Sequence, residues 1–217
     1  MNSSRQSFFA ACLLLGAFLC QPSIAAAGVY EDLRWAVEDN NVADLRKLLE
    51  RGADPNTPDE RGNTLLMVAV RNKNADLVDL LVNAGAKLNL RNKYGETAIM
   101  LASYNGLGGI VQKLYVKGAE VNHQGWNPLL YAATSGHAGI IQLLLDGGVP
   151  INSTSDNGTT ALMMAARGNH TNAVKVLLKN GADPNIRNES DGTALKWALA
   201  RKHHDAAELL KSSGAKE

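Results

Sequence analysis

The chain has 217 residues, of which 45% are hydrophobic and 20% are charged, and its formal net charge is +1. These are the values of an ordinary globular protein, and they exclude a disordered or fibrous chain. A nucleic-acid-binding protein needs a basic surplus or a basic stripe. Because the sequence has neither, we exclude DNA and RNA as partners.

The N-terminal segment, 1–27, differs from the rest of the chain. Arg5 is its only charged residue, residues 8–19 form an apolar run, and residues 25–27 are three alanines. A basic start, an apolar run of about a dozen residues and a small-residue end are typical of a secretory signal peptide. We therefore expect residues 1–27 to be a signal peptide, with cleavage after Ala27 or, as the alternative, after Ala25.

Two other interpretations of this segment are disfavoured. The apolar run is shorter than the roughly 20 residues that a transmembrane helix needs, so a retained membrane anchor fits poorly. A lipid-anchored form needs small residues before its cysteine, and Phe18 and Leu19 precede Cys20. We expect no membrane span in the mature chain.

The positions of the two cysteines help to predict the cellular compartment of the mature chain. Cys12 and Cys20 both lie inside the expected signal peptide, so the mature chain would have no thiol and no disulfide. Extracellular eukaryotic domains usually contain disulfides, so a cysteine-free exported chain fits the bacterial periplasm better. We expect a periplasmic or otherwise secreted protein.

Internal repetition dominates the remaining sequence. Alanines recur at a regular interval, shortened only between Ala102 and Ala132, and a glycine follows each of them at one fixed distance. We call these the register alanines (Ala36, Ala69, Ala102, Ala132, Ala165 and Ala198) and the register glycines (Gly52, Gly85, Gly118, Gly148, Gly181 and Gly214). Their period, roughly 33 residues, predicts a solenoid of stacked supersecondary units.

In chain order, the first unit covers residues 28–58 and the last covers residues 188–217. The first lacks the polar start of the others and the last is followed by no further unit, so we expect both to act as caps. The complete set is 28–58, 59–91, 92–121, 122–154, 155–187 and 188–217.

Each unit is predicted to contain two short helices. A capping residue opens the first helix of units two to six: Thr64, Thr97, Asn127, Thr160 and Thr193. Pro128 stands at a first helical position, where a missing N–H is tolerated. Polar or glycine residues break the chain, and a second helix follows with an apolar stripe such as Leu45, Leu48 and Leu49. The register glycine is expected to end that helix in a left-handed conformation.

A loop of turn residues then joins each unit to the next. The loop near residues 122–125 is three residues shorter than its counterparts. We expect it to lack a full hairpin and to alter the local curvature.

Two recurring motifs resemble those of the ankyrin repeat. Residues 64–69 (Thr-Leu-Leu-Met-Val-Ala) and 127–132 (Asn-Pro-Leu-Leu-Tyr-Ala) resemble T-P-L-H-x-A, and residues 177–185 are similar to L-L-x-x-G-A-D-x-N. The resemblance implies an all-α solenoid of helix-loop-helix units joined by short loops or β-hairpins. With the expected signal peptide, the chain resembles exported bacterial ankyrin-repeat proteins. The motif histidine is absent and is replaced by Met67, Met100, Leu130, Met163 and Lys196.

The histidines favour a structural role. His137, His170 and His203 occupy equivalent places just after the inter-helix break, and a repeated position predicts a repeated task, here bonding to loop backbone. Adjacent histidines such as His203 and His204 point in different directions on a helix and make a poor metal pair. No catalytic triad or paired-carboxylate motif is present, so we predict no enzyme, no cofactor and no metal site.

The methionines allow two interpretations. Met67, Met100 and Met163 share one structural position and should form a row, with Met164 beside it. Methionine fills irregular gaps in a core, which is the favoured interpretation. Thioethers can also bind copper(I) or react with oxidants, so a redox or copper role is the alternative.

In the ankyrin family, the concave face formed by loop tips and first helices carries the partner contacts. The matching positions in this chain are Glu60, Arg61, Asn63, Arg71, Asn72, Lys93, Tyr94, Glu96, Tyr104, Asn105, His123, Gln124, Trp126, Thr134, Asp156, Asn157, Thr159 and Arg167. Tyr94, Tyr104 and Trp126 fall in the middle of the stack, where aromatic side chains suggest a binding hot spot. The alternative is that Trp126 fills the space left by the short loop.

These observations predict a monomeric, non-enzymatic binding module of the cell envelope that holds a partner protein. An immunity or inhibitor protein that occludes a toxin or hydrolase is the alternative within the same class.

Overall fold

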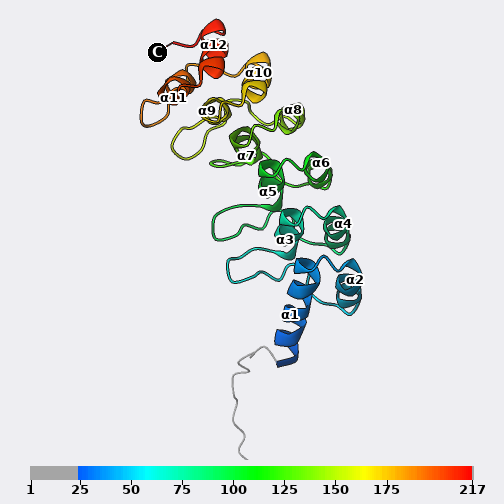
Figure 1. Ribbon diagram of the computed structural model, residues 1–217. Coiled ribbons are helices and arrows are strands. Elements are labelled where there is room, and N and C mark those ends of the chain that lie inside the picture. The colour runs from blue at the N-terminus through cyan, green and yellow to red at the C-terminus, as the bar shows by residue number, and fades with distance from the viewer. Residues whose placement is uncertain (1–23, 217) are drawn as a thin grey trace, which may run out of the picture.

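The computed structural model describes residues 24–216, which form a single curved stack of helix pairs (Figure 1). The described residues contain twelve helices: α1 Ile24–Glu38, α2 Val42–Glu50, α3 Leu65–Arg71, α4 Ala75–Asn83, α5 Ala98–Tyr104, α6 Gly108–Val116, α7 Pro128–Thr134, α8 Ala138–Asp146, α9 Ala161–Arg167, α10 Thr171–Lys179, α11 Ala194–Ala200 and α12 His204–Ser212. The predicted all-α solenoid is therefore confirmed.

The expected signal peptide lies mostly outside the described residues. Residues 1–23 are not described, and α1 begins at Ile24 and runs across both expected cleavage positions. Among residues 24–216, no helix combines the length and the apolar character needed to cross a membrane.

The helices form two layers, with the loops on one side. Odd-numbered helices form one row, even-numbered helices form a second row behind it, and the inter-unit loops project from the first row away from the second (Figure 1). We call the surface made by these loops and the odd-numbered helices the loop face. β-Hairpins do not form in residues 24–216: the loops carry only isolated bridges, between Pro58 and Thr64 and between Thr154 and Thr160.

Local chemistry sets the ends of the helices as predicted. The side-chain oxygen of Thr64 accepts a hydrogen bond from the Met67 amide at 3.3 Å, and the equivalent bond is made in the other capped units. Each such bond satisfies an amide that the first turn of a helix leaves without a partner. The register glycines have φ between 83° and 92°, the left-handed conformation that favours glycine.

The core is continuous along the stack. All six register alanines are buried, and their small side chains allow neighbouring odd-numbered helices to pack closely. Leu45, Leu77, Leu114, Ile141 and Leu177 carry the apolar stripe of the even-numbered helices into the same core. Because each unit buries its apolar surface mainly against its neighbours, the stack is stabilised by interfaces between units.

Polar bonds also join successive units. The ring nitrogens of His137, His170 and His203 lie 2.9, 3.0 and 3.2 Å from backbone carbonyl oxygens. Each of these carbonyls lies near the end of the odd-numbered helix in the preceding unit. The repeated structural role is thus confirmed, but the carbonyl belongs to the neighbouring unit. Between the first two units, Nδ2 of Asn72, from a different repeat position, donates to the Val37 carbonyl near the end of α1.

A ladder of asparagines provides a second tie. The side-chain oxygens of Asn56, Asn89, Asn152 and Asn185 each accept a hydrogen bond from a backbone amide 31 residues later, at 2.7 to 3.0 Å. For Asn122 the equivalent donor would be the backbone nitrogen of Pro150, and proline has no N–H. The ladder is therefore interrupted at the unit that has the short loop.

Candidate functional site

The short loop leaves a notch in the loop face. Four residues, 123–126, separate Asn122 from the cap of α7, whereas the other loops have seven residues at this place. Figure 1 shows the loop before α7 projecting less than the loops before α3, α5 and α9.

Neighbouring long loops bond to each other on either side of the notch. The Lys93 amide donates to the Arg61 carbonyl at 3.0 Å, and the Glu189 amide donates to the Asn157 carbonyl at 3.1 Å. In the described structure, the short loop makes no such backbone hydrogen bond to either of its neighbouring loops. The four long loops thus form two pairs, with the notch between them.

His123 closes the short loop. Its Nε2 atom lies 2.6 Å from the Trp126 carbonyl oxygen, while its Nδ1 atom is buried without a hydrogen-bond partner. Burial is the main cause that lowers the pKa of His123 below its ordinary value of 6.5. Gly125 allows the next loop to approach closely, because a Cβ atom there would lie 2.7 Å from Oδ1 of Asp156.

An aromatic hollow opens on the α5 side of the notch. Its volume is about 350 Å³, and its lining consists of Tyr94, Gly95, Tyr104, Trp126, Tyr131 and Thr134. The ring of Tyr131 is central: it lies 6.2 Å from the Tyr104 ring and 5.4 Å from the Trp126 ring, edge to face in both cases. Such pairs are favourable, so they hold the walls of the hollow in place.

The aromatic rings of this hollow remain open to solvent. Tyr94 is 71% exposed, Tyr104 48% and Trp126 38%. Trp126 thus packs against Tyr131, as the space-filling interpretation expects, and still presents a large part of its indole at the surface.

A carboxylate lies behind the hollow. Oε1 of Glu96 accepts a hydrogen bond from the Tyr131 hydroxyl at 3.3 Å, and Oε2 accepts one from Nδ2 of Asn92 at 2.8 Å. Burial, followed by the Glu96 charge, raises the pKa of Tyr131 to about 12. The phenol therefore stays neutral at physiological pH.

A separate polar hollow lies across the short loop. It has a volume of about 580 Å³ and is lined by residues 122–125 together with Pro150, Ser153, Thr154, Ser155 and Asp156. It opens where the asparagine ladder is interrupted.

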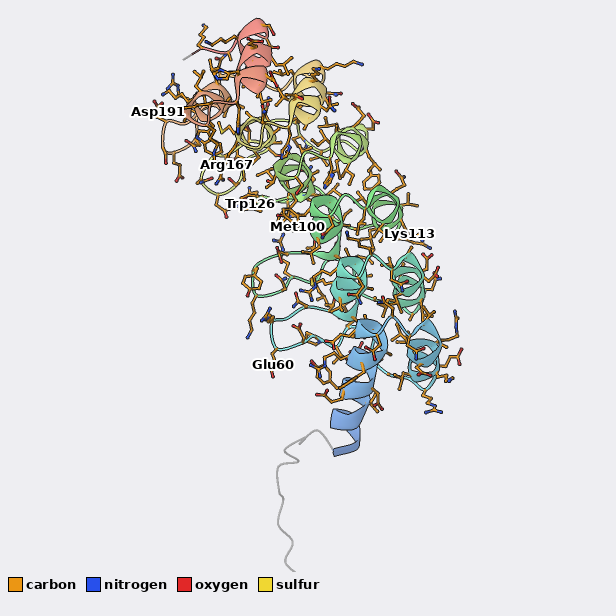
Figure 2. The ribbon with its side chains drawn as sticks, in the orientation of Figure 1. Glu60, Met100, Lys113, Trp126, Arg167 and Asp191 are labelled. Carbon is orange, nitrogen blue, oxygen red and sulfur yellow. The ribbon has the colours of Figure 1, made fainter. Side chains whose placement is uncertain are left out.

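Most of the residues predicted for the partner surface lie on the loop face. Exposed members are Glu60, Arg61, Arg71, Asn72, Lys93, Tyr94, Tyr104, Gln124, Trp126, Asp156, Asn157 and Arg167, and half-buried members are Glu96, Asn105, His123 and Thr134. Figure 2 shows Glu60, Trp126 and Arg167 on the loop side and Lys113 on the opposite side.

The structure contradicts two members of that prediction. Asn63 and Thr159 are each only 2% exposed. Asn63 donates to Asp59 and accepts from Asn92, while the Thr159 amide donates to Ser155, so both residues stabilise the loops from inside. Trp126 occupies the same place, one residue before a helix cap, but its indole is larger, stays partly exposed and lines the aromatic hollow.

Tyr131 was not predicted as a site residue. It precedes a register alanine, a place held by Val68, Leu101 and Met164 in neighbouring units and by Trp197 in the last. The sequence did contain an indication of this role: Tyr131 is an aromatic residue at the position before a register alanine, in the unit that begins with the short loop. Its pairing with Glu96, 35 residues away, depends on the stacking of units.

The methionine row is part of the core. Met67, Met100, Met163 and Met164 are all buried, and the Met100 sulfur accepts a hydrogen bond from the Thr97 amide at 3.3 Å. Burial contradicts the redox or copper alternative, since that chemistry needs accessible thioethers.

Comparison with known families gives a match over nearly the whole described chain. A family model described as "Ankyrin repeats (3 copies)" matches residues 33–125, 100–188 and 129–217. No curated protein matches this chain.

Proposed function

The chain belongs to the ankyrin-repeat family, and from that premise we propose that its loop face holds a partner protein at the notch. Ankyrin repeats are protein–protein interaction modules, and proteins built from them are generally non-enzymatic scaffolds. The partner-binding residues that we propose lie on the loop face, with the notch near their centre: Arg61, Arg71, Lys93, Tyr94, Glu96, Tyr104, Asn105, His123, Gln124, Trp126, Asp156, Asn157 and Arg167.

The observation that carries this proposal is the exposed aromatic hollow. Hot spots in protein interfaces are enriched in Trp, Tyr and Arg and lie near the centre of the contact. Tyr94, Tyr104 and Trp126 occupy that central position, and exposed Arg71 and Arg167 flank them along the row of odd-numbered helices.

We further propose that the protein acts as a monomer in the cell envelope, after cleavage of residues 1–27, and that its partner is another envelope protein. The signal-like sequence of that segment supports this location. Cell fractionation, with mass determination of the purified chain, tests it: an uncleaved cytoplasmic chain would contradict the proposal. Capture of a toxin or hydrolase would favour the inhibitor alternative.

Partner binding is tested with the triple variant Tyr94→Ala, Tyr104→Ala, Trp126→Ala. We expect it to lose capture of the partner from a periplasmic extract at least tenfold, because removing several hot-spot side chains costs about 1–2 kcal/mol each. The matched control removes three exposed side chains of the even-numbered row: Val116→Ala, Lys117→Ala, Lys179→Ala.

Circular dichroism and urea unfolding of both triple variants separate binding from folding. Retained capture by the notch variant contradicts the proposal. If the notch variant unfolds, the single change Tyr94→Ala replaces it, because this side chain is the most exposed of the three.

A further inference from the structure

We propose that the aromatic hollow receives a basic side chain, lysine or arginine, presented by the partner protein. The inference rests on the proposed function and names the chemistry of the group that is bound.

The walls of the hollow suit a cation. The faces of Trp and Tyr rings carry negative electrostatic potential and attract ammonium and guanidinium groups. Tyr104 and Trp126 stand at interplanar angles of 80° and 71° to Tyr131, so adjoining walls face different directions around one space. A cation in that space can contact more than one ring.

Glu96 supplies the complementary charge. It is half-buried, and its carboxylate accepts a hydrogen bond from the Tyr131 hydroxyl, which places a negative charge beside the central ring. Arg91 is the nearest basic residue: its guanidinium donates to the carbonyl of Gly95 at the rim of the hollow, but its side chain is not part of the lining, and Lys93 is exposed on the loop.

Two small residues, Gly95 and Thr134, complete the otherwise aromatic lining and keep the hollow open. Thr134 stands two residues after a register alanine, where neighbouring units carry the long side chains Arg71, Tyr104 and Arg167. With Gly95 on the opposite loop, Thr134 leaves the space that a partner side chain needs.

The last two units contain an internal counterpart. There the Arg167 guanidinium carbon lies 5.8 Å from the centre of the Trp197 ring. Arg167 and Trp197 occupy the same repeat positions as Tyr104 and Tyr131. The loop face thus already binds a cation over an aromatic ring of this row with its own side chain.

Small-molecule probes of the basic side chains test the inference on the full chain. N-acetyl-arginine amide, N-acetyl-lysine amide and the neutral isostere N-acetyl-citrulline amide are titrated while the Trp126 indole N–H is followed by NMR. We expect saturable shifts with both basic probes and binding of the citrulline probe weaker by about three- to tenfold, the range that a cation–π contact supports.

Variants locate the effect. Glu96→Gln keeps a hydrogen-bond acceptor for Tyr131 and removes the charge, so we expect it to weaken both basic probes by about three- to tenfold. Glu60→Gln, on an exposed loop, is the matched control and should change nothing. If Glu96→Gln fails to fold, Tyr131→Leu takes its place. This change copies Leu101 of the preceding unit and removes the central ring, so we expect it to abolish the preference for basic probes.

Three results would overturn the inference: equal binding of the citrulline probe, shifts at Trp197 in place of Trp126, or no saturable shift. Each is distinct from failure of the proposed function. Loss of capture in the aromatic triple variant without any preference for basic probes would retain protein binding and reject the cation. Unchanged capture by the triple variant, together with a clear preference of the natural chain for basic probes, would retain the cation site and reject the notch as the place where the partner protein binds.

Discussion

Among single residues of the loop face, His123 combines one hydrogen bond with one buried nitrogen that has no partner. It bonds the Trp126 carbonyl through Nε2, and its buried Nδ1 has no partner. Protonation would place a proton on that buried nitrogen without an acceptor, which is why burial lowers the pKa of this imidazole.

This environment predicts a pH dependence of stability. Because the folded-state pKa of His123 lies below its unfolded value of 6.5, the unfolded chain binds the proton more readily. The contribution to stability is therefore fully present above pH 6.5 and is lost as the pH falls through the folded-state pKa. Urea unfolding at about pH 7.5 and about pH 5.5 should show a larger decrease for the natural chain than for His123→Gln.

A glutamine amide can still donate to the Trp126 carbonyl but does not titrate. His123→Gln therefore separates the effect of protonation from the effect of the hydrogen bond. His204→Gln, at an exposed position of α12, is the control and should keep the full pH dependence. Identical pH profiles for the natural chain and His123→Gln would refute this account.

Residues at the turn between the two helices of a unit have a second special geometry. The equivalent positions are Asn40, Lys73, Gly106, Gly136, Asn169 and Lys202, and all have φ between 53° and 75°. Lysine adopts this left-handed region only at a cost of about 1 kcal/mol, whereas glycine does so freely.

Lys73→Gly and Lys202→Gly should therefore raise the free energy of unfolding, by up to about 1 kcal/mol each. Lys117→Gly is the matched control: its φ is −82°, so glycine there relieves no strain and should be neutral or destabilising. Chemical denaturation measures all three, and destabilisation by both turn substitutions would contradict the strain argument.

Among the elements, the inter-unit loops are ordered by the asparagine ladder. The Asn89 side chain accepts from the Glu120 amide at 2.9 Å, whereas in the described structure Asn122 makes no such bond, because Pro150 has no N–H. The same residue type at the same repeat position thus ties two units together in one place and makes no such tie in the other.

Alanine substitution should expose this difference. We expect Asn89→Ala to lower the free energy of unfolding by about 1 kcal/mol, the usual net contribution of one hydrogen bond. Asn122→Ala should change it by much less. Urea unfolding of the two variants side by side is the measurement, and equal losses would show that the ladder does not tie the units.

At the scale of the whole molecule, the shortness of one loop, three residues fewer than its counterparts, shapes the loop face. The loop-to-loop bonds are thereby limited to two pairs of long loops, and the exposed rings of Tyr94, Tyr104 and Trp126 lie between those pairs. The proposed partner site is therefore a consequence of loop length as much as of residue type.

Restoring the missing length should remove the site. Replacing residues 123–125 with a copy of residues 90–95 restores the length and keeps Trp126; it would allow loop-to-loop bonds to continue across the notch and would cover the hollow. We expect partner capture to fall at least as far as in the aromatic triple variant, with the helical content unchanged by circular dichroism. A grafted chain that still captures the partner would show that the notch is not required.

Much of the architecture could be predicted from the sequence because it depends on local chemistry. A threonine caps the amide three residues later, and a register glycine adopts a positive φ where its helix ends. Both interactions lie within one turn of chain, and repetition at a fixed period identified them in unit after unit. The curved two-layer stack of helix pairs follows from the same pattern.

The composition of the loop face was decided only by the tertiary structure. Asn63 and Thr159 are polar loop residues, yet they are buried, because neighbouring loops lie against each other. Tyr131 became part of the hollow, and Glu96 its partner, through contacts between residues 35 positions apart. Such contacts depend on the offset between stacked units, and at the notch that offset differs from the repeat. A periodic sequence pattern determines each unit, but only the packing of units determines which side chains meet across an irregular junction.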